Sequence, residues 1–154
     1  MIVVSDTSAI SALLKIGRAD LLSKLYGEVF VPQAVKNELL VAHPVIPGFF
    51  RVVPIANQNL FARLRAEIDG GEAEAIVLAM ELKADNLLID EVRGRRVAIR
   101  EGVHIIGLLG VILECKVRGL IPSVKQIIGE LEGKTYFRIA DPLKTAILHE
   151  AGEL

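Results

Sequence analysis

Acidic residues stand at two places in the sequence where parallel-sheet proteins build active sites. Asp6 comes directly after the apolar residues 2–4. Asp90 and Glu91 come directly after the apolar residues 87–89. Apolar runs without polar alternation are typical of strands that are buried on both faces. Because ligands bind at the edge where the carboxyl ends of parallel strands meet, we expect these carboxylates to share one site.

Further acids lie on the helices expected around these strands. Glu38 lies on the apolar side of the helix after the second strand, beside Val35 and Leu39. Glu72 and Glu74 lie in the first turn of a helix that leads into the later strand. Carboxylates gathered in one place repel one another and shift toward protonation unless a cation compensates. The pattern therefore predicts a cation at the cluster.

The residue types of this cluster favour Mg²⁺ or Mn²⁺. Ligand sets made only of oxygen suit these hard cations rather than Zn²⁺. The histidines are too widely spaced to form a zinc motif; they are His43, His104 and His149. A divalent cation at such a site polarises a phosphodiester, activates a water and offsets charge on the leaving oxygen.

Each acid also has a purely structural interpretation. Asp6 could serve only as an N-cap, and Glu38 as a solvated helix residue. Glu72 and Glu74 could merely complement the helix dipole, an interpretation that we favour for Glu72. One of the two acids near residue 90 could simply cap the helix that follows. Each acid alone is weak evidence for a site. The prediction depends on all of them together, because parallel strands place their carboxyl ends along one edge of the sheet.

Three arginines follow the second acidic site and are the natural phosphate contacts. They are Arg93, Arg95 and Arg96. Guanidinium forks match phosphate oxygens, although the same residues could form a solvated helix face. The net charge of −1 gives no indication of a nucleic-acid-binding protein. With no Trp, five Phe and two Tyr, the composition gives no support for base stacking by interleaved aromatic residues.

The elements that must position these residues alternate between strand and helix. This order predicts parallel βαβ units and an α/β fold, a three-layer α/β/α sandwich around a mainly parallel sheet. Pro54 places its strand at an edge, since it cannot donate to a central ladder. The expected strands cover residues 2–4, 29–31, 51–55, 86–89, 103–105 and 135–139. The expected helices cover residues 7–16, 19–25, 32–40, 57–67, 72–83, 93–100, 108–117, 122–131 and 141–152.

Length and composition fit one globular domain of 154 residues, of which 52% are hydrophobic. We expect no membrane segment and no signal peptide. Cys115 is the only cysteine, so we expect it to be buried and the protein to be cytoplasmic. The mean hydropathy of +0.47 and the very apolar segments near 10–25 and 108–117 predict a homodimer.

At four places the sequence resembles the PIN-domain family. The matching segments are Val3-Val4-Ser5-Asp6-Thr7-Ser8, Val35-Lys36-Asn37-Glu38-Leu39, Gly71-Glu72-Ala73-Glu74-Ala75-Ile76 and Leu87-Leu88-Ile89-Asp90-Glu91. The resemblance covers roughly residues 1–120. It is strongest to compact prokaryotic PIN proteins described as predicted nucleic-acid-binding proteins, and more distant to VapC-like toxin ribonucleases. It implies one PIN-like domain over residues 1–154, with residues 120–154 a C-terminal extension packed on it.

The resemblance implies a nuclease that uses Mg²⁺ or Mn²⁺ and acts on RNA. By position, Asp6 matches the first acid of the family and Glu38 the second. Glu74 matches the third acid, which is usually an aspartate at a helix start. The fourth falls at Asp90 or Glu91. The small polar residue that supports the metal or its waters is matched by Ser8, and Ile89 replaces the Thr or Ser that usually precedes the fourth acid.

Three functions are compatible with these observations. The leading one is a metal-dependent endoribonuclease, with an antitoxin protein as partner if the chain is the toxin of a toxin–antitoxin pair. The second is a PIN-like module that binds nucleic acid or a protein without cleaving. The third is a phosphotransfer domain with Asp6 as nucleophile. A haloacid-dehalogenase-type phosphatase needs a second Asp where Ser8 stands, and the Asp and Lys pattern of a receiver domain is not evident.

Overall fold

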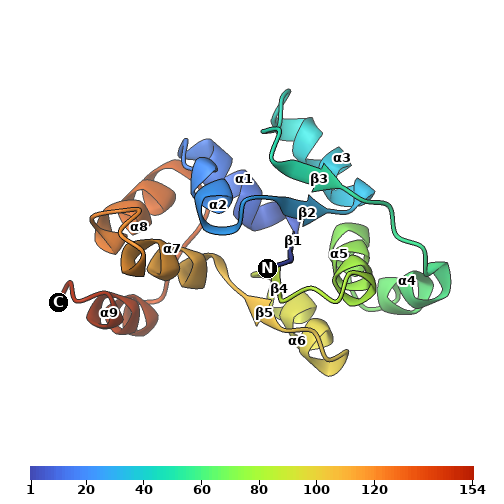
Figure 1. Ribbon diagram of the computed structural model, residues 1–154. Helices are drawn as coiled ribbons and strands as arrows, with labels where there is room; N and C mark the ends of the chain where they lie inside the picture. Colours follow the sequence, from blue (N-terminus) through green and yellow to red (C-terminus); the bar gives the residue numbers. More distant parts are fainter.

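A five-stranded parallel sheet forms the centre of the computed structural model, which describes residues 1–154 (Figure 1). The strand order is β3-β2-β1-β4-β5, and every neighbouring pair is parallel. The strands are β1 (Val3–Ser5), β2 (Val29–Val31), β3 (Phe50–Val52), β4 (Asn86–Leu88) and β5 (Ile105–Ile106). The predicted α/β/α sandwich is confirmed, and β3 is the edge strand that Pro54 predicted.

Helices form the connections between the strands and the C-terminal third of the chain. They are α1 (Thr7–Lys15), α2 (Asp20–Tyr26), α3 (Gln33–Ala42), α4 (Gln58–Arg65), α5 (Gly70–Glu81), α6 (Val92–Arg100), α7 (Leu108–Val117), α8 (Val124–Lys134) and α9 (Asp141–Glu150). Each expected helix is present with ends shifted by a few residues. The shift that matters most for the site is at α5, which begins at Gly70 rather than at residue 72. The Asp69 side chain accepts a hydrogen bond from the Glu72 N–H and so caps the start of this helix.

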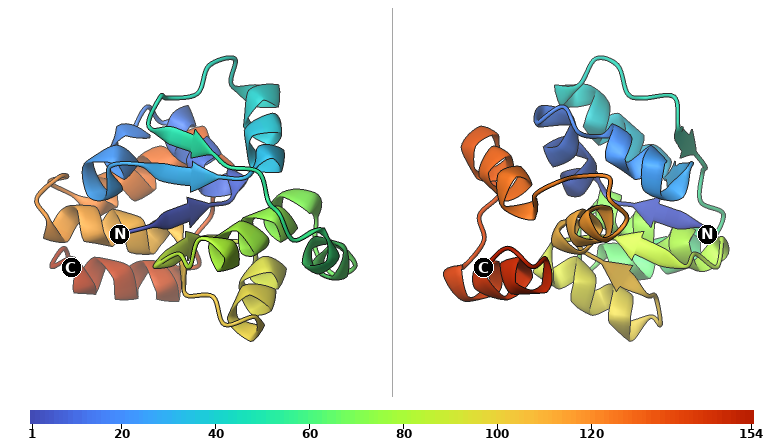
Figure 2. Two further views of the ribbon diagram at one scale, coloured as in Figure 1. Left: turned by 45° about the vertical axis from the view of Figure 1, so that its right-hand side comes forward. Right: turned by 60° about the vertical axis from the view of Figure 1, so that its left-hand side comes forward.

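Two hydrophobic cores lie on the two faces of the sheet. Successive residues of β4 and its end alternate between them, with Leu88 in one core and Leu87 and Ile89 in the other. The first core joins α1, α2 and α7 to α8 and α9, whereas the second joins α4, α5 and α6. Helix α3 contacts both α1 and α5. Figure 2 shows helices on both sides of the sheet, with α8 and α9 at the periphery.

The direction of strand addition reverses beside β1. From β1 the chain builds outward through β2 to β3, and then returns to add β4 on the other side of β1. Val4 pairs with Leu87 and Ser5 with Leu88, so both strands end at the same level. The Asp6 N–H donates to the Leu88 carbonyl at 3.0 Å and extends this pairing. Ligands of open α/β sheets bind outside such a reversal point, and Asp6 stands there.

The strand expected at residues 135–139 is wrong. This segment connects α8 to α9 and pairs with no strand of the sheet. Its Phe137 N–H donates to the Thr135 hydroxyl at 3.0 Å instead of to a neighbouring strand. The burial of its residues nevertheless alternates as in a strand, since Thr135, Phe137 and Ile139 are more buried than Tyr136 and Arg138.

The C-terminal end of the chain is tied back onto the start of α8 through Glu153. Its carboxylate accepts from the backbone N–H groups of Val124 and Lys125 at 2.7 and 3.0 Å. It also accepts from the Ser123 hydroxyl at 2.9 Å and pairs with Lys116 at 3.0 Å. Although burial opposes ionisation, these donors lower the pKa of Glu153 to about 2.

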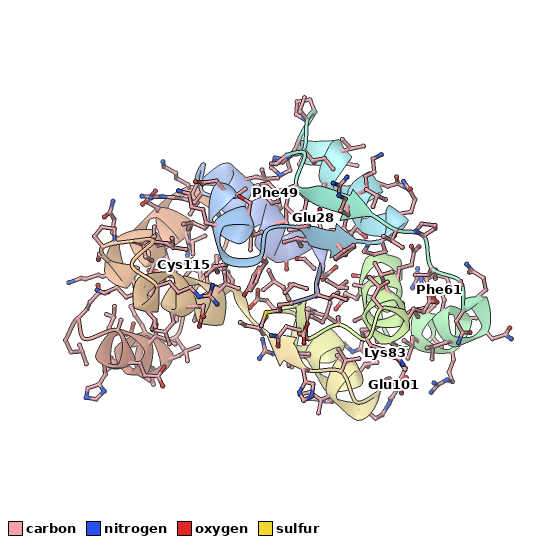
Figure 3. All side chains as sticks on the ribbon, viewed as in Figure 1. Glu28, Phe49, Phe61, Lys83, Glu101 and Cys115 are labelled. Carbon is pink, nitrogen blue, oxygen red and sulfur yellow. The ribbon has the colours of Figure 1, made fainter.

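The apolar residues of α1, α2 and α7 are largely taken up by the first core. Cys115 of α7, labelled in Figure 3, is fully buried there, and burial raises its pKa to about 11. The apolar character of these helices is therefore explained within one chain, and the homodimer stays a prediction. No helix in the structure combines the length and the apolar character needed to cross a bilayer.

Candidate functional site

A pocket of about 610 Å³ opens at the carboxyl edge of the sheet. Its volume is within the range of roughly 300–1,000 Å³ that is usual for ligand sites. Five carboxylates line it, and they come from the ends of β1 and β4, from α3 and from the start of α5. They are Asp6, Glu38, Asp69, Glu72 and Glu91, and we call the cavity the acidic pocket.

Asp6 lies at the N-cap position of α1, but its side chain makes no capping hydrogen bond to the helix. The carboxylate therefore does not cap the N–H groups of the second and third residues of α1, as a regular N-cap would, and only the Thr7 N–H acts on it. Asp6 is only 6% exposed. Burial raises its pKa to about 7, opposed by the Thr7 N–H and reinforced by nearby acids such as Asp69 and Glu38.

Glu72 is as buried as Asp6. It is 6% exposed, and its Oε2 atom has no hydrogen-bond partner. Burial raises its pKa well above its usual range, and hydrogen bonding to Asp69 and the charges of Asp69 and Asp6 add to the shift. A buried carboxylate oxygen without a partner is costly, so it needs either a proton or a cation.

Glu38 closes the pocket from α3. Its Oε2 atom accepts a hydrogen bond from the Thr7 hydroxyl at 2.6 Å. The carboxylate also lies against the backbone of Gly71, where any Cβ would collide with it. The first turn of α5 therefore approaches Glu38 closely only because residue 71 is glycine. Glu38 is exposed rather than on the apolar side of its helix, and these two contacts hold its carboxylate beside Thr7 and Gly71.

The two candidates for the fourth acid have different surroundings. Glu91 is exposed, lines the acidic pocket and makes no capping bond to α6. Asp90 accepts from the Leu108 N–H at 3.1 Å and thereby caps α7. Burial raises its pKa, opposed by that N–H and by the charge of Arg95. Asp90 lines a smaller cavity of about 200 Å³, which shares Ser8, Glu91 and Phe137 with the acidic pocket.

Glu74 lies outside the acidic pocket. Its Oε1 atom accepts from the Ala34 N–H at 3.3 Å, so it faces the start of α3. Successive residues of a helix are rotated by about 100°, so Glu72 and Glu74 lie about 200° apart around α5 and cannot face the same cavity. The structure brings Glu72 to the pocket, and a metal-binding role for Glu74 stays a prediction.

None of the three predicted phosphate-binding arginines lines the pocket. Arg93 and Arg96 are exposed on α6 and form no ion pair within the chain. Arg95 is half-buried and donates to the Ile89 carbonyl at 2.9 Å. Two of the arginines are therefore without an ion pair on the helix that follows Glu91, while Arg95 supports the end of β4.

Several residues of the pocket were not singled out by sequence reasoning. Asp69 lies just before the helix expected at residues 72–83, and an acid before a glycine pair is an N-cap signal that could have identified it. Lys15 lies on α1 and lines the pocket with the same helix's Ser8. Tyr136 and Phe137 come from the α8–α9 connection, and no local pattern in the sequence could have placed them near residue 6.

The pocket contains the oxygen donors that a divalent cation requires, but they do not converge on one point as a complete ligand set. No three His, Cys, Asp or Glu side chains are arranged as a metal site. The donors are all carboxylates, which suits Mg²⁺ or Mn²⁺. The buried Oε2 atom of Glu72 has no hydrogen-bond partner, and a cation in this carboxylate-lined pocket could supply one. The residues present therefore fit such a cation.

Comparison with known families decides the relationship. A family model described as PIN domain matches residues 2–153. The chain belongs to the PIN-domain family. The match extends through α8 and α9, further than the resemblance seen in residues 1–120. Neither the curated proteins nor the solved structures contain a match to the chain. PIN domains are in general nucleases, bind nucleic acid and typically use divalent metals.

Gly94 of α6 makes room for Glu72, and this contact yields a stability prediction. A Cβ atom at Gly94 would collide with the Glu72 carboxylate and would lie 2.7 Å from Cδ1 of Ile89. Both partners are buried, so neither can move aside freely. We expect Gly94→Ala to destabilise the protein by about 1–3 kcal/mol, measured by urea unfolding, because overpacking outweighs the better helix propensity of alanine.

Gly129 of α8 provides the matched control for this prediction. A Cβ there meets no atom within 4 Å, and the residue is exposed. Gly129→Ala should therefore stabilise the protein by roughly 0.5–1 kcal/mol through helix propensity alone. If both alanine variants were equally stabilising, α6 would not pack against Glu72 as closely as described.

Proposed function

We propose that this PIN domain is a Mg²⁺- or Mn²⁺-dependent endoribonuclease that hydrolyses phosphodiester bonds in RNA at the acidic pocket. The observation that carries the proposal is the Oε2 atom of Glu72, a buried carboxylate oxygen without a partner among four further acids. Nothing in a purely structural role explains why five carboxylates from four parts of the chain should line one cavity.

Asp6, Glu72 and Glu91 are the residues that we propose as cation ligands, with Asp90 as the alternative to Glu91. When bound, the cation would polarise the phosphodiester and lower the pKa of an attacking water. Ser8 lines the pocket beside these acids and can hold a water through its hydroxyl. Glu38 and Asp69 are the remaining acids, and each can accept a proton from a water that enters the pocket.

The direct test is cleavage of a labelled RNA in the presence of Mn²⁺ and in the presence of a chelator. We expect cleavage that requires the cation and that produces internal fragments. The second candidate function is a binding module without catalysis, and it is favoured by the capping of α7 by Asp90 and by the lack of a complete ligand set. RNA binding without cleavage in any divalent metal would establish that second function instead.

Arg93 and Arg96 lead to a prediction about binding. Both are exposed and unpaired on α6, the helix that follows Glu91, so we expect them to contact the phosphate backbone. The double variant Arg93→Ala/Arg96→Ala should weaken RNA binding while kcat stays the same. Each lost phosphate contact should reduce the slope of log K against log salt by about 0.7 for a single strand, so the two together should reduce it by about 1.4.

The matched control for the arginine variant is Arg51→Ala. Arg51 is also exposed, but it lies on the edge strand β3 and pairs with Glu28 at 2.8 Å. Its removal should leave both affinity and salt slope unchanged. An unchanged slope in the Arg93 and Arg96 double variant would remove these residues from the proposed RNA path.

Two finer predictions concern partners. If the protein is the toxin of a toxin–antitoxin pair, a short frame upstream of its gene should encode a DNA-binding antitoxin that binds this chain. The homodimer is tested by sedimentation at micromolar concentration, where a monomer would contradict it. Both predictions are independent of the acidic pocket, and cleavage of RNA does not require either.

A further inference from the structure

The segment between α8 and α9 presents a tyrosine to solvent at the acidic pocket. Tyr136 lines the pocket and yet is 95% exposed. Its neighbours Thr135 and Phe137 line the same pocket and are half-buried, and Phe137 packs against the first core. An aromatic side chain that is almost fully exposed between two anchored neighbours has no evident role in stability.

The backbone that carries Tyr136 is held on both sides. The Thr135 hydroxyl donates to the Leu131 carbonyl at 2.6 Å and accepts from the Phe137 N–H at 3.0 Å. Arg138 donates through one guanidinium nitrogen to the carbonyls of Thr135 and Phe137, at 3.0 and 2.7 Å. Ile139 is buried and closes the segment. The ring of Tyr136 is therefore presented from a fixed position.

A cation accompanies this aromatic ring in the pocket. Lys15 of α1 also lines the acidic pocket, is exposed and forms no ion pair within the chain. One cavity thus combines carboxylates, a free ammonium group and an exposed ring. A nucleotide offers complementary groups, because its phosphate attracts a cation and its base has two faces that stack on aromatic rings.

We propose that Tyr136 is the stacking platform for an unpaired base of single-stranded RNA, with Lys15 contacting a neighbouring phosphate. The inference rests on the proposed function and names its substrate class. A base within a duplex already has both faces covered by neighbouring base pairs, so only an unpaired base can lie on Tyr136. The platform therefore selects single strands, loops or ends over duplex RNA.

Binding is measured by fluorescence anisotropy with a labelled single-stranded oligouridylate, in the Asp6→Asn background to prevent cleavage. We expect Tyr136→Ala to raise the Kd about 5- to 150-fold, the equivalent of one lost base–aromatic stack. Tyr136→Phe keeps the ring and should bind like the parent. Because Tyr136 is exposed, both variants should keep the melting temperature of the parent. Equal affinities for the Ala and Phe variants would overturn the inference.

Intrinsic fluorescence gives a readout that does not depend on cleavage. The chain has two tyrosines and no Trp, so Tyr26→Phe leaves Tyr136 as the only strong emitter. Stacking should quench its emission as the oligouridylate is added, whereas a fully paired RNA duplex should not. Unchanged emission at saturating single-stranded RNA would overturn the inference. If the surface at Tyr136 binds only proteins, Tyr136→Ala will leave the Kd for RNA unchanged, and this result would also overturn the inference.

The two proposals can fail separately. The protein could cleave RNA with Mn²⁺ while Tyr136→Ala leaves the Kd unchanged and RNA leaves the tyrosine emission unchanged. The stacking proposal would then be wrong, and the proposed nuclease function would be retained. If Tyr136 is quenched by RNA and no cleavage occurs, the platform stands on a binding module. In an active enzyme, Tyr136→Ala should raise KM and leave kcat unchanged, since the ring holds the base and does not touch the reacting phosphate.

Discussion

Asp6→Asn should abolish RNA cleavage and leave the fold intact. Removing a residue that only supports a metal ligand typically costs about 10- to 100-fold in affinity or activity, so the loss of a ligand should cost at least about 100-fold. The side chain makes no capping bond, and asparagine would still cap α1 if needed. Asparagine also removes a charge whose burial is unfavourable, so the metal-free variant should melt at the same temperature as the parent or higher.

The second half of this prediction concerns the stabilisation by Mn²⁺. At about 100 times its Kd, Mn²⁺ stabilises a protein by about 2.7 kcal/mol, and a site weakened about 100-fold gains only about 0.4 kcal/mol. For a chain of this length these values correspond to roughly 5–10 °C and 1–2 °C in melting temperature. Melting curves with and without Mn²⁺, beside the cleavage assay, measure both effects.

Asp85→Asn is the matched control for the Asp6 variant. Asp85 precedes β4, at the opposite edge of the sheet, and accepts from the Ile2 N–H at 2.6 Å. It should affect neither cleavage nor the Mn²⁺ shift. If Asp6→Asn cleaves RNA as the parent does, or if Mn²⁺ changes the melting of neither protein, Asp6 is a structural residue and the proposed nuclease site loses its centre.

The fold and the first acid were predictable because local signals determine them. Apolar runs that are buried on both faces, separated by helices, leave few alternatives to a parallel sheet. The residue that follows the central strand then lies at the edge where the order of strands reverses. Asp6 and the Asp90–Glu91 pair follow from this reasoning alone, without any knowledge of side-chain contacts.

The choice between Glu72 and Glu74 could not be made in the same way. Matching the sequence of this segment to the family by position selected Glu74. In the helix, however, Glu72 lies on the same buried face as Ala75, Ile76 and Ala79. That face was visible in the sequence, but a buried glutamate costs free energy unless something compensates. The burial of Glu72 is intelligible only once Asp69, Gly94 and the pocket are known.

The sequence could not predict that the α8–α9 connection lines the acidic pocket, and the reason is different. We expected residues 135–139 to form a strand, and their burial does alternate as in a strand, yet they pair with no strand of the sheet. What holds the segment is packing of Phe137 and Ile139 against the first core. A pocket lined by residues about 130 positions apart in the sequence has no local signature.

Glu72→Gln and Glu74→Gln, made side by side, test the site assignment. Both exchanges keep the shape of the side chain and remove one charge. Glutamine at residue 74 can still accept from the Ala34 N–H. At residue 72 the backbone N–H still donates to Asp69, and the glutamine amide can replace the side-chain hydrogen bond to Asp69, so both variants should fold. We expect Glu72→Gln to lose at least about 100-fold in kcat/KM and most of the Mn²⁺ stabilisation, because it removes a carboxylate that faces the pocket.

Glu74→Gln should retain most of the activity and the full Mn²⁺ shift, because its carboxylate lies outside the pocket. The reverse result, with Glu74→Gln inactive and Glu72→Gln active, would mean that α5 turns by about half a revolution relative to the arrangement described, as the positional match to the family implies. Equal losses in both variants would point to a shared electrostatic role of the α5 N-terminus rather than to ligation by either residue. Because the two residues lie on opposite sides of one helix, a single cation can be held by only one of them, and the pair of variants identifies which.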